Sequence, residues 1–580
     1  ICTWNRALIK LDDRNPMLSN SYNFKREYAT RSFNTVYASF DIWKGIKFAS
    51  TFSYDFVMNK SRAWKDPRTS DGDDDNGRFS KDYNDITNMT WSNILTYQTK
   101  IKKKHNLDLL VGYEINSKES DGLGTTISNF ARWDKPEVNN GVVYQSMGGS
   151  NSTTRIVSYI TRANYDYDNK YYLGASWRTD GSSRLARENR WGNFWSLSGA
   201  WRVSSESFMK PLQNWLSDLK LRVSYGVNGT LPSSYYGYMG LSSLTSNYND
   251  NPGITQSQLE NKELTWETNY NFNSGIDLGF FDNRLNVTFE YYVRTTKNLL
   301  YSRPLSLATG FSSYLANIGK LQNKGYELEI RSTNIETKDF RWSTSLNLGH
   351  NANKILKLDG DLKQVTSGTS IHKVGLPYST YYMIEFAGID PVDGEPMFYK
   401  NTTDENGNLN KETTKDPRSA EKVILQCADP TITGGLGNSI SYKWFDLNFN
   451  VNFSFGAWNY DGAAGKLEHG GDGTLNIPIY YRKRWQKEGD ETSIERFVVG
   501  RSISMTDYAT TRRLYSGDYV RLKNLTFGFT LPKTWTRKVG IDNIRLYASG
   551  NNLLTWAAYD YIDPESGSSP SWDTPPMRTY

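Results

Sequence analysis

Strict alternation of apolar and polar residues over long segments is the feature that most constrains the fold of this chain. Between residues 445 and 455, odd positions carry Phe, Leu or Val, whereas even positions carry Asp, Asn or Ser. A period of two residues indicates a β-strand with two different faces. Such a pair of faces suits lipid on one side and water on the other, and does not suit a soluble core. We therefore predict lipid-facing Phe445, Leu447, Phe449, Val451 and Phe453, and lumen-facing Asn448, Asn450 and Asn452.

A second hairpin, residues 168–202, repeats the pattern. It starts with the tight-turn sequence Asp168-Asn169-Lys170 and reverses through the charged loop GSSRLARENR. Tyr, Leu, Trp and Ala side chains alternate with small or polar ones on both of its strands. For this hairpin alone, a soluble sandwich and a membrane-spanning barrel are equally good explanations, so the connections along the rest of the chain must decide.

Short and long connections alternate along the chain, and this decides between the two folds. Outer-membrane barrels have short periplasmic turns and long external loops, whereas a propeller would show a repeat of blade length. We count about 18 strand segments of roughly 10 to 16 residues, longer than the usual globular strand of about 5–6. The sequence thus predicts an all-β, transmembrane antiparallel β-barrel. Short turns fall near 44–45, 102–104, 168–170, 281–283 and 443–444, and long polar loops near 60–86, 118–152, 227–262, 354–376 and 457–515.

Composition agrees with this prediction but leaves an alternative open. Hydrophobic residues make up only 37% of the 580 residues, and the mean hydropathy is −0.66. A transmembrane helix needs about 18 or more consecutive apolar residues, and the sequence has no such run. Aromatic residues reach 14%. Low hydropathy with many aromatics suits a barrel, in which only alternate residues meet lipid, but it also suits a secreted carbohydrate-binding β protein.

The residues that usually carry chemistry are sparse. The two cysteines, Cys2 and Cys427, match neither a disulfide framework nor a zinc site, and the four histidines are isolated in the sequence. No HExxH, GxSxG or P-loop pattern is present. The net charge of +6 has no basic cluster behind it. We therefore expect no enzymatic activity, no cofactor and no nucleic-acid partner.

Several motifs, taken in order, resemble the C-terminal barrel portion of the SusC/RagA-like TonB-dependent outer-membrane transporters of Bacteroidetes. The resemblance begins near residue 30 and extends to the end of the chain, and the order and spacing of its motifs are specific. It is carried by RTDGSSR (178–184), RWGNFWSLSGAWR (190–202), LKLRVSYG (219–226), LTWE (264–267), NIG (317–319), NKG (323–325), AGIDP (387–391), NNL (551–553) and DPE (563–565).

The resemblance implies most of a 22-stranded barrel with an N-terminal plug and a TonB-box segment. It also implies energised import of oligosaccharides, or in some members peptides, a SusD-like lipoprotein over the external mouth, and possible pairing of two such complexes. The plug is absent from this numbering, and the chain ends where the family continues into a final strand. We accordingly divide the chain into residues 1–30, a loop or partial strand, and 31–580, the barrel with long extracellular loops.

The external loops hold the candidate ligand residues. Aromatic rings can stack on sugars, so Tyr235, Tyr236, Tyr238, Trp458 and Tyr460 are candidates, although packing among loops or against a partner also explains them. Loops of this length should be mobile unless something packs on them. In the loop SDGDDDNG, the alternating residues Asp71, Asp73 and Asp75 weakly resemble a calcium loop, and a solvated loop explains them equally simply.

Three functions remain open at this stage. The first is TonB-dependent import across the bacterial outer membrane with a lipoprotein lid, in which TonB acts through the N-terminal region and lipid surrounds the barrel. The second is a passive porin or adhesin barrel, and the third is a secreted glycan-binding β protein. Arg178, Arg202, Arg222 and Arg294 share the polar faces of their strands, where ion pairs explain them better than passage of anions.

Overall fold

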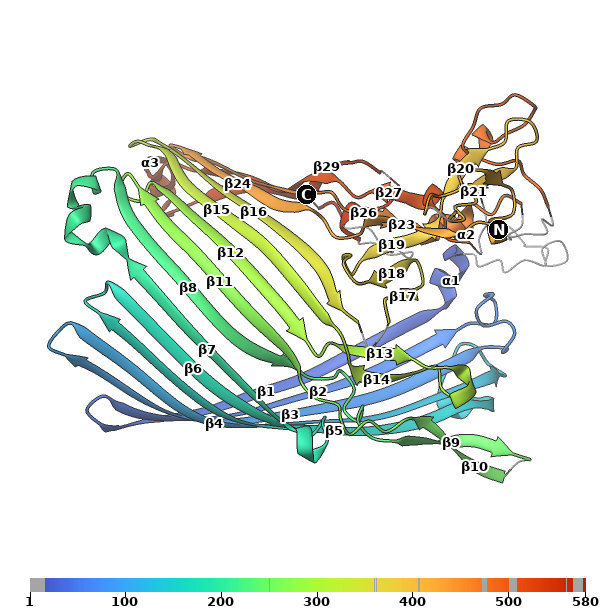
Figure 1. Ribbon diagram of the computed structural model, residues 1–580, viewed down its shortest axis with the longest axis horizontal. Helices are drawn as coiled ribbons and strands as arrows, with labels where there is room; N and C mark the ends of the chain where they lie inside the picture. Colours follow the sequence, from blue (N-terminus) through green and yellow to red (C-terminus); the bar gives the residue numbers. More distant parts are fainter. Residues whose placement is uncertain are drawn as a thin grey trace. The chain divides into compact units, whose positions relative to one another are not determined.

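One large antiparallel sheet organises the chain (Figure 1). The computed structural model describes residues 16–249, 251–358, 360, 362–404, 407–471, 477–499, 508–559, 561–566 and 577–579. Sixteen of the strands in this part of the chain are hydrogen-bonded in the order β1 to β8, β11, β12, β15, β16, β24, β25, β28 and β29. Sequence-adjacent strands of the sheet are thus neighbours, which confirms the predicted all-β antiparallel fold. The count is sixteen rather than about 18 because several predicted strands belong to small separate sheets.

The strands of the main sheet are β1 (Phe24–Trp43), β2 (Ile46–Lys65), β3 (Arg78–Ile101), β4 (His105–Phe130), β5 (Gly141–Tyr167), β6 (Tyr171–Ser182), β7 (Trp191–Arg202), β8 (Leu216–Thr230), β11 (Glu267–Phe280), β12 (Leu285–Lys297), β15 (Lys320–Glu336), β16 (Phe340–Lys357), β24 (Ile432–Tyr442), β25 (Phe445–Phe455), β28 (Tyr519–Thr530) and β29 (Arg545–Ala557). The smaller sheets use β9 (Leu241–Tyr248), β10 (Asn251–Gln258), β13 (Leu300–Pro304), β14 (Ser313–Asn317), β17 (Gln364–Ser367), β18 (Ser370–Lys373), β19 (Thr380–Ile384), β20 (Phe386–Ile389), β21 (Pro396–Tyr399), β22 (Thr413–Thr414), β23 (Lys422–Cys427), β26 (Trp458–Tyr460) and β27 (Leu514–Ser516). The α-helices are α1 (Pro16–Tyr22), α2 (Gly462–Leu467) and α3 (Lys533–Thr536).

The chain contains two compact units, which are described separately below. Unit 1 comprises Ile1–Ser198, Gly226–Asn269 and Asn298–Ile318. Unit 2 comprises Gly199–Tyr225, Tyr270–Lys297 and Gly319–Tyr580.

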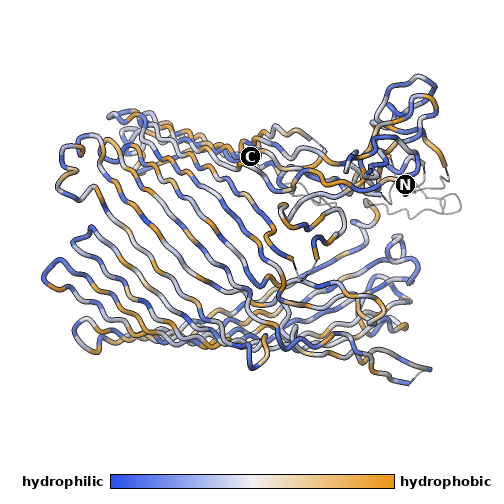
Figure 2. Tube along the Cα trace, in the orientation of Figure 1, coloured by the Kyte–Doolittle hydropathy of each residue, from blue (hydrophilic) through white to orange (hydrophobic). Residues whose placement is uncertain are grey.

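In unit 1, strand register assembles the alternating residues into apolar and polar rows. β1 to β6 run side by side, and hydrophilic and hydrophobic residues alternate along them (Figures 1 and 2). Because directly paired residues share a face, one row is apolar across five strands. This row consists of Val36, Phe52, Trp91, Ile115 and Val157. A neighbouring row on the opposite face is polar and consists of Thr51, Ser92, Glu114, Ser158 and Asp180.

The polar face is held by ion pairs. In unit 1, Arg178 Nε lies 2.7 Å from Asp180 Oδ1, and its Nη2 donates to Ser158 Oγ at 2.9 Å. In unit 2, Arg222 Nε lies 2.9 Å from Asp277 Oδ2 and also pairs with Glu290. Arg202 Nε lies 3.5 Å from Asp218 Oδ1. The predicted ion pairs are thus confirmed for these three arginines, and a role in anion passage stays untested.

The β24–β25 hairpin of unit 2 has the two faces that the sequence predicted. On the apolar face, Phe445 stacks on Phe529 of β28 with ring centroids 4.8 Å apart. On the other face, Asn448 and Asn450 line a polar hollow together with Arg331. None of the five residues in the predicted lipid-facing row is buried in a core.

The turns between paired strands are short where the sequence predicted short turns, and left-handed residues close them. Lys102 and Lys103 have φ of 49° and 60°, and Asp168 and Asn169 have φ of 56° and 53°. Tight hairpin turns need this left-handed region because its twist matches that of the flanking strands. Two connections in the same series are longer. Residues 203–215 contain the 3₁₀ helices Val203–Ser205 and Ser207–Leu212, and residues 531–544 contain α3.

Two of the predicted long loops were wrong in extent. β2 continues to Lys65 and β3 begins at Arg78, so only the middle of 60–86 is a loop. β4 continues to Phe130 and β5 begins at Gly141, so most of 118–152 is strand. The hydrogen bonds between paired strands need only backbone groups, and polar or Gly-rich segments supply these as well as apolar ones do. Strands can therefore continue where the apolar alternation stops. Similarly, β1 begins at Phe24 rather than Arg31, whereas residues 1–15 lie outside the described part.

No helix in the described part of the chain is both long and apolar enough to cross a membrane.

The first prediction concerns the apolar face of β25. Phe449 lies near the centre of this 11-residue strand, so Phe449→Arg places a cation in hydrocarbon. We expect a loss of about 2–4 kcal/mol in the free energy of unfolding in lipid vesicles. Asn450→Arg introduces the same side chain on the polar face and should cost far less. Equal losses for the two variants would contradict the assignment of the faces.

Candidate functional site

The two longest connections of unit 2 fold together into one ordered body, which we call the loop body. It comprises the described parts of residues 358–431, between β16 and β24, and of residues 456–518, between β25 and β28. Three small sheets organise it: β17, β18, β19 and β23 form one, β20, β21 and β22 another, and β26 and β27 the third. Long loops are expected to be mobile unless something packs on them, and here each connection packs on the other.

Direct hydrogen bonds join the two connections. The amide of Phe386 donates to Thr511 Oγ1 at 3.0 Å. The indole Nε1 of Trp485 donates to the carbonyl of Pro391, also at 3.0 Å. These partners are more than ninety residues apart in sequence in both cases, so the contacts fix the fold of the whole loop body.

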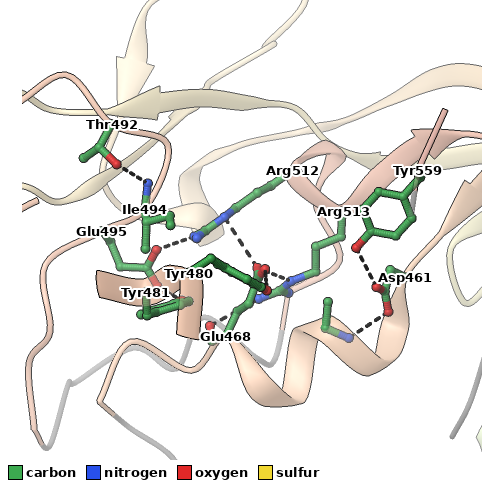
Figure 3. Close-up of polar contacts among 11 residues, drawn as sticks. Asp461, Glu468, Tyr480, Tyr481, Thr492, Ile494, Glu495, Arg512, Arg513 and Tyr559 are labelled. Atoms are coloured by element: carbon green, nitrogen blue, oxygen red, sulfur yellow. Dashed lines mark hydrogen bonds and ion pairs between the residues drawn. The ribbon is translucent and has the colours of Figure 1, made fainter. Parts of the chain in front are cut away.

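Four charged side chains meet inside the loop body, and we call them the acid–arginine cluster (Figure 3). They are Glu468, which follows α2, together with Glu495 and the adjacent pair Arg512 and Arg513. Arg512 pairs with Glu495, and its Nε lies 3.7 Å from Glu468 Oε2. Arg513 Nε lies 3.5 Å from the same oxygen. The Glu495 side chain is fully buried, so this is a charge-balanced cluster removed from water.

Neighbouring groups keep the cluster in one charge state. Burial on its own would lower the pKa of the Arg512 guanidinium, but the carboxylate of Glu495 and then Tyr481 and Glu468 raise it above its ordinary value. Burial, followed by Glu495, raises the pKa of Tyr481, so this hydroxyl stays protonated and donates to Glu495 Oε1 at 2.9 Å. The arginine and the phenol are therefore fixed as a cation and a neutral donor.

Four tyrosine rings, two from the loop body and two from the segment after β29, contact one another in a row that we call the tyrosine ladder. Tyr515 and Tyr559 stack with centroids 3.8 Å apart and an interplanar angle of 11°. Tyr561 follows at 5.3 Å from Tyr559, and Tyr480 lies 5.5 Å from Tyr561. The ladder is anchored because Tyr559 donates to Asp461 Oδ2 at 3.0 Å, and this carboxylate also caps α2. Tyr561, between Tyr559 and Tyr480, is 70% exposed, whereas the hydroxyl of Tyr480 donates to Glu468 of the acid–arginine cluster.

Trp458 and Tyr460, two of the predicted ligand residues, lie on β26 within the loop body. Both rings pack against a buried cluster that contains Tyr381 and Met383 of β19 and Leu514 of β27. The Tyr381 hydroxyl donates to the Trp458 carbonyl at 3.2 Å. Burial raises the pKa of Tyr460. The structure thus brings these two aromatics together in an internal packing role, and their role in ligand binding stays a prediction.

The other predicted tyrosines lie in unit 1, in residues 231–240, and each has a protein contact. The Tyr235 ring lies under the Arg184 guanidinium, 4.4 Å from ring centroid to Cζ. The Tyr236 hydroxyl accepts from the amide of Thr153 at 2.9 Å. Tyr238 packs against the buried cluster of Leu185, Phe194, Leu264 and Trp266. These contacts match the alternative of packing among loops, and ligand binding by these rings also stays a prediction.

The acidic run in the loop 66–77 does not gather into a metal site. Asp71 Oδ2 accepts from Asn23 Nδ2 at 3.3 Å, and Asp75 lies 3.3 Å from Arg78 Nη1. Within the described ranges, no three His, Cys, Asp or Glu side chains are placed to hold a metal ion. Asp73 shares the loop with these residues but adds no third ligand, so we propose no calcium site at Asp71, Asp73 and Asp75.

Sequence patterns gave no sign of the acid–arginine cluster. Its four members are spread between residues 468 and 513. Because charged residues in polar loops are usually exposed to solvent, the sequence predicts each of them to be exposed. The adjacent Arg512-Arg513 pair is the only local hint, and it does not reveal its partners. Tyr559 and Tyr561, separated by one residue, could have been noticed by the criterion that selected Trp458 and Tyr460.

Comparisons with known proteins agree on one family. The family model described as TonB dependent receptor-like, beta-barrel matches residues 3–553. TonB-dependent receptor P3 of Formosa agariphila is 33% identical over 558 residues, covering 91% of this chain and 54% of the relative. TonB-dependent receptor SusC of Bacteroides thetaiotaomicron is 31% identical over 437 residues, covering 71% and 41%. The chain therefore spans about half the length of the curated relatives it matches.

Solved structures give the same result for the fold. The structure of the RagAB peptide transporter superposes with a TM-score of 0.87 at 26% identity, covering 97% of this chain and 62% of the other. The structure of the RagAB peptide importer in its closed-closed state superposes with a TM-score of 0.86 at 27% identity.

The second prediction concerns the acid–arginine cluster. Glu495→Gln removes one partner of a buried ion pair and leaves Glu468 as the one acid beside Arg512 and Arg513, which should destabilise the loop body by about 3–5 kcal/mol. Hydrogen exchange of amides in residues 477–499 and 508–518 measures this local stability. Glu412→Gln, in an exposed pair with Lys400, is the matched control and should leave exchange unchanged. Because an apolar pair of similar volume can replace a buried ion pair, Glu495→Leu with Arg512→Met should recover most of the loss.

Proposed function

Because the chain belongs to the TonB-dependent receptor-like β-barrel family, whose members are outer-membrane transporters and not enzymes, we propose that the whole protein imports nutrients across the outer membrane. Energy for import is supplied through TonB, acting on the N-terminal region of the whole protein. The described strands form part of the wall of the path, with an apolar face toward lipid and a polar, ion-paired face toward the lumen.

The ordered loop body is the observation that best supports an importer with a selective entrance. A simple pore needs loops only to connect its strands. Here two connections build three small sheets around a buried acid–arginine cluster, and the result is a rigid platform. Rigid aromatic side chains give a large contact area at a low cost in conformational entropy. Tyr561, the exposed ring of the tyrosine ladder, is the residue we assign to substrate contact.

We propose oligosaccharides or peptides as the substrates. The face of a tyrosine ring suits both, because sugars present apolar C–H faces and peptides present apolar side chains and planar amides. The RagAB structure is titled as that of a peptide transporter, which supports the peptide arm of the proposal. The oligosaccharide arm rests on what the resemblance of the motifs to the SusC/RagA-like family implies.

A SusD-like lipoprotein covers the loop body in this proposal. Although the loop body is ordered by its own contacts, it leaves large apolar side chains in water, including Ile479 at 74% and Val499 at 80% exposure. Exposed apolar residues that gather on one body are typical of protein–protein contact surfaces. We further propose that two such transporter–lipoprotein pairs associate in the membrane, which rests on the family resemblance alone.

The third prediction tests import directly. Intact cells are given labelled oligosaccharides or labelled peptides, and uptake of each is measured with and without TonB. We expect uptake of one of the two classes to require TonB. Tyr561→Ala should lower that uptake by roughly two- to tenfold at sub-saturating substrate, since it removes one aromatic contact. Tyr547→Ala, an exposed tyrosine on β29, is the control and should not change uptake. Uptake of both classes that is unaffected by loss of TonB would instead indicate a passive porin.

The fourth prediction tests the lid. Affinity purification of the full-length protein from native outer membrane in mild detergent should recover a lipoprotein near one-to-one. Ile479→Asp with Val499→Asp should lower the recovered amount severalfold, because both charges would be buried without partners. The matched control is Val539→Asp, which is also exposed but lies in the connection between β28 and β29. Recovery of the barrel alone, or an equal loss in the control, would contradict the lidded importer.

A further inference from the structure

Three neighbouring turns of unit 1 bring lysines together, which corrects the expectation that the positive charge has no basic cluster behind it. Residues 44–45, 102–104 and 168–170 contain five lysines and a single acid, Asp168. The turns are adjacent in space, since Gln98 N donates to the Gly45 carbonyl at 2.8 Å and Asp168 N donates to the Lys104 carbonyl at 2.7 Å. We call the lysines Lys44, Lys102, Lys103, Lys104 and Lys170 the lysine turns.

Most of this positive charge is not neutralised within the unit. Lys104 Nζ lies 3.3 Å from Asp168 Oδ2, and this pair accounts for the only acid on the three turns. Lys44, Lys102 and Lys103 are exposed, and no ion pair to them occurs among the described residues. Three cations thus remain available to an external anion.

The backbone of the middle turn holds two of these lysines in an uncommon conformation. Lys102 and Lys103 both lie in the left-handed region, with φ of 49° and 60°. Asn-Gly and Asp-Gly suit such a turn best, and the neighbouring turn uses Asp168-Asn169 at φ of 56° and 53°. Lysine gains nothing from this conformation and is strained in it.

Aromatic and apolar side chains border the lysine turns on the outer face of the sheet. By strand register, Trp43, Tyr97 and Ile101 share the face of the apolar row that contains Trp91. Trp43 is 76% exposed, and Tyr171 stacks on Tyr167 beside the third turn. Amphipathic aromatic rings in this position are typical of the level of lipid headgroups, so the lysines next to them lie at the depth of phosphates.

Unit 2 shows the same combination independently. Its turn at 443–444 places Lys443 at φ of 52°, directly before the exposed Trp444. Trp444 lies 6.5 Å from Trp535, between ring centroids, and Trp535 belongs to α3, which begins at Lys533. A lysine in a strained turn beside an interfacial tryptophan is therefore a repeated feature of these hairpins.

We propose that the lysine turns bind the phosphate headgroups of anionic phospholipids in the leaflet that the short turns face. Lysines at a membrane surface attract anionic lipid, and the bordering aromatics hold the turns at headgroup depth. The occupant is a lipid rather than a protein because the cations and the aromatic ring border are arranged along the membrane boundary of a barrel wall. This inference rests on the outer-membrane location and is independent of what the protein imports.

Lipid selectivity of the full-length protein tests the proposal. The protein is reconstituted in phosphatidylcholine vesicles containing trace spin-labelled phosphatidylglycerol or phosphatidylcholine, and the association ratio of the two labels is measured by electron paramagnetic resonance. We expect the wild type to prefer phosphatidylglycerol. Lys102→Asn with Lys103→Gly should lower this preference by about two- to fivefold at low salt, and less at physiological salt because of screening. The same variant should unfold at an unchanged or higher temperature, because Asn and Gly accept the left-handed turn.

Matched variants separate headgroup binding from general charge. Lys47→Gln with Lys100→Gln removes the same charge from exposed lysines of the same two hairpins that lie on the polar face of the sheet. This control should keep the preference for phosphatidylglycerol. Lys44→Gln, outside the left-handed turn, should lower the preference by a smaller amount. An unchanged ratio in the Lys102/Lys103 variant, or an equal drop in the Lys47/Lys100 control, would overturn the proposal.

Discussion

The structure depends first on the need to satisfy every backbone N–H and C=O within the protein where the chain crosses lipid. A hydrocarbon layer offers no hydrogen-bond partners, so strands can cross it only when each is paired on both sides. This requirement explains why consecutive strands of the described chain pair in order into one antiparallel sheet. It also leaves side chains free to alternate. The ladder is indifferent to side-chain type, so one face can become apolar and the other polar without any change in the backbone.

The sequence predicts the part of the fold in which the two faces meet different solvents. Residues 445–455 alternate between apolar and polar side chains, as expected for a strand between lipid and water, and β25 is found there with its pairing to β24 as predicted. In the extensions of β2 to β5 the sequence is polar or Gly-rich on both faces, so the alternation fades although the strands stay paired. β4 and β5 have 26 and 27 residues, far more than the roughly 9–11 needed to span hydrocarbon. Their polar halves were predicted to be loops because the alternation of apolar and polar residues depends on which solvent each face meets. Strand pairing does not depend on it, because the neighbouring strand supplies the backbone hydrogen-bond partners.

The candidate site could be predicted only in part, for a related reason. Sequence patterns identified the loops and their aromatics, and Trp458 and Tyr460 do lie in the loop body. They could not show that Glu468 and Glu495 meet Arg512 and Arg513, since those contacts come from the folding of two separate connections. A buried ion pair contributes little net stability, but losing one partner is costly, so the cluster selects one arrangement of the loops over others. The order of the loop body thus depends on charge pairs between segments that are distant in the sequence. No local sequence pattern reveals these pairs.

The two units differ in whether their charged side chains are paired with opposite charges, and this difference indicates what kind of partner each surface suits. Inside the loop body of unit 2, two acids and two arginines balance one another out of water, whereas Ile479, Val499 and, beyond β29, Tyr561 expose apolar or aromatic side chains. Such a surface suits another protein or a neutral substrate, because neither requires a counter-charge to be desolvated. The lysine turns of unit 1 do the opposite, since they leave cations exposed beside aromatic rings and even hold two of them in a strained backbone conformation. Unbalanced positive charge at the membrane boundary has a natural counterpart in lipid phosphate. Both surfaces are built on strand hairpins of the same kind. The different partners proposed for them therefore follow from side chains, which the backbone hydrogen bonds between strands do not constrain.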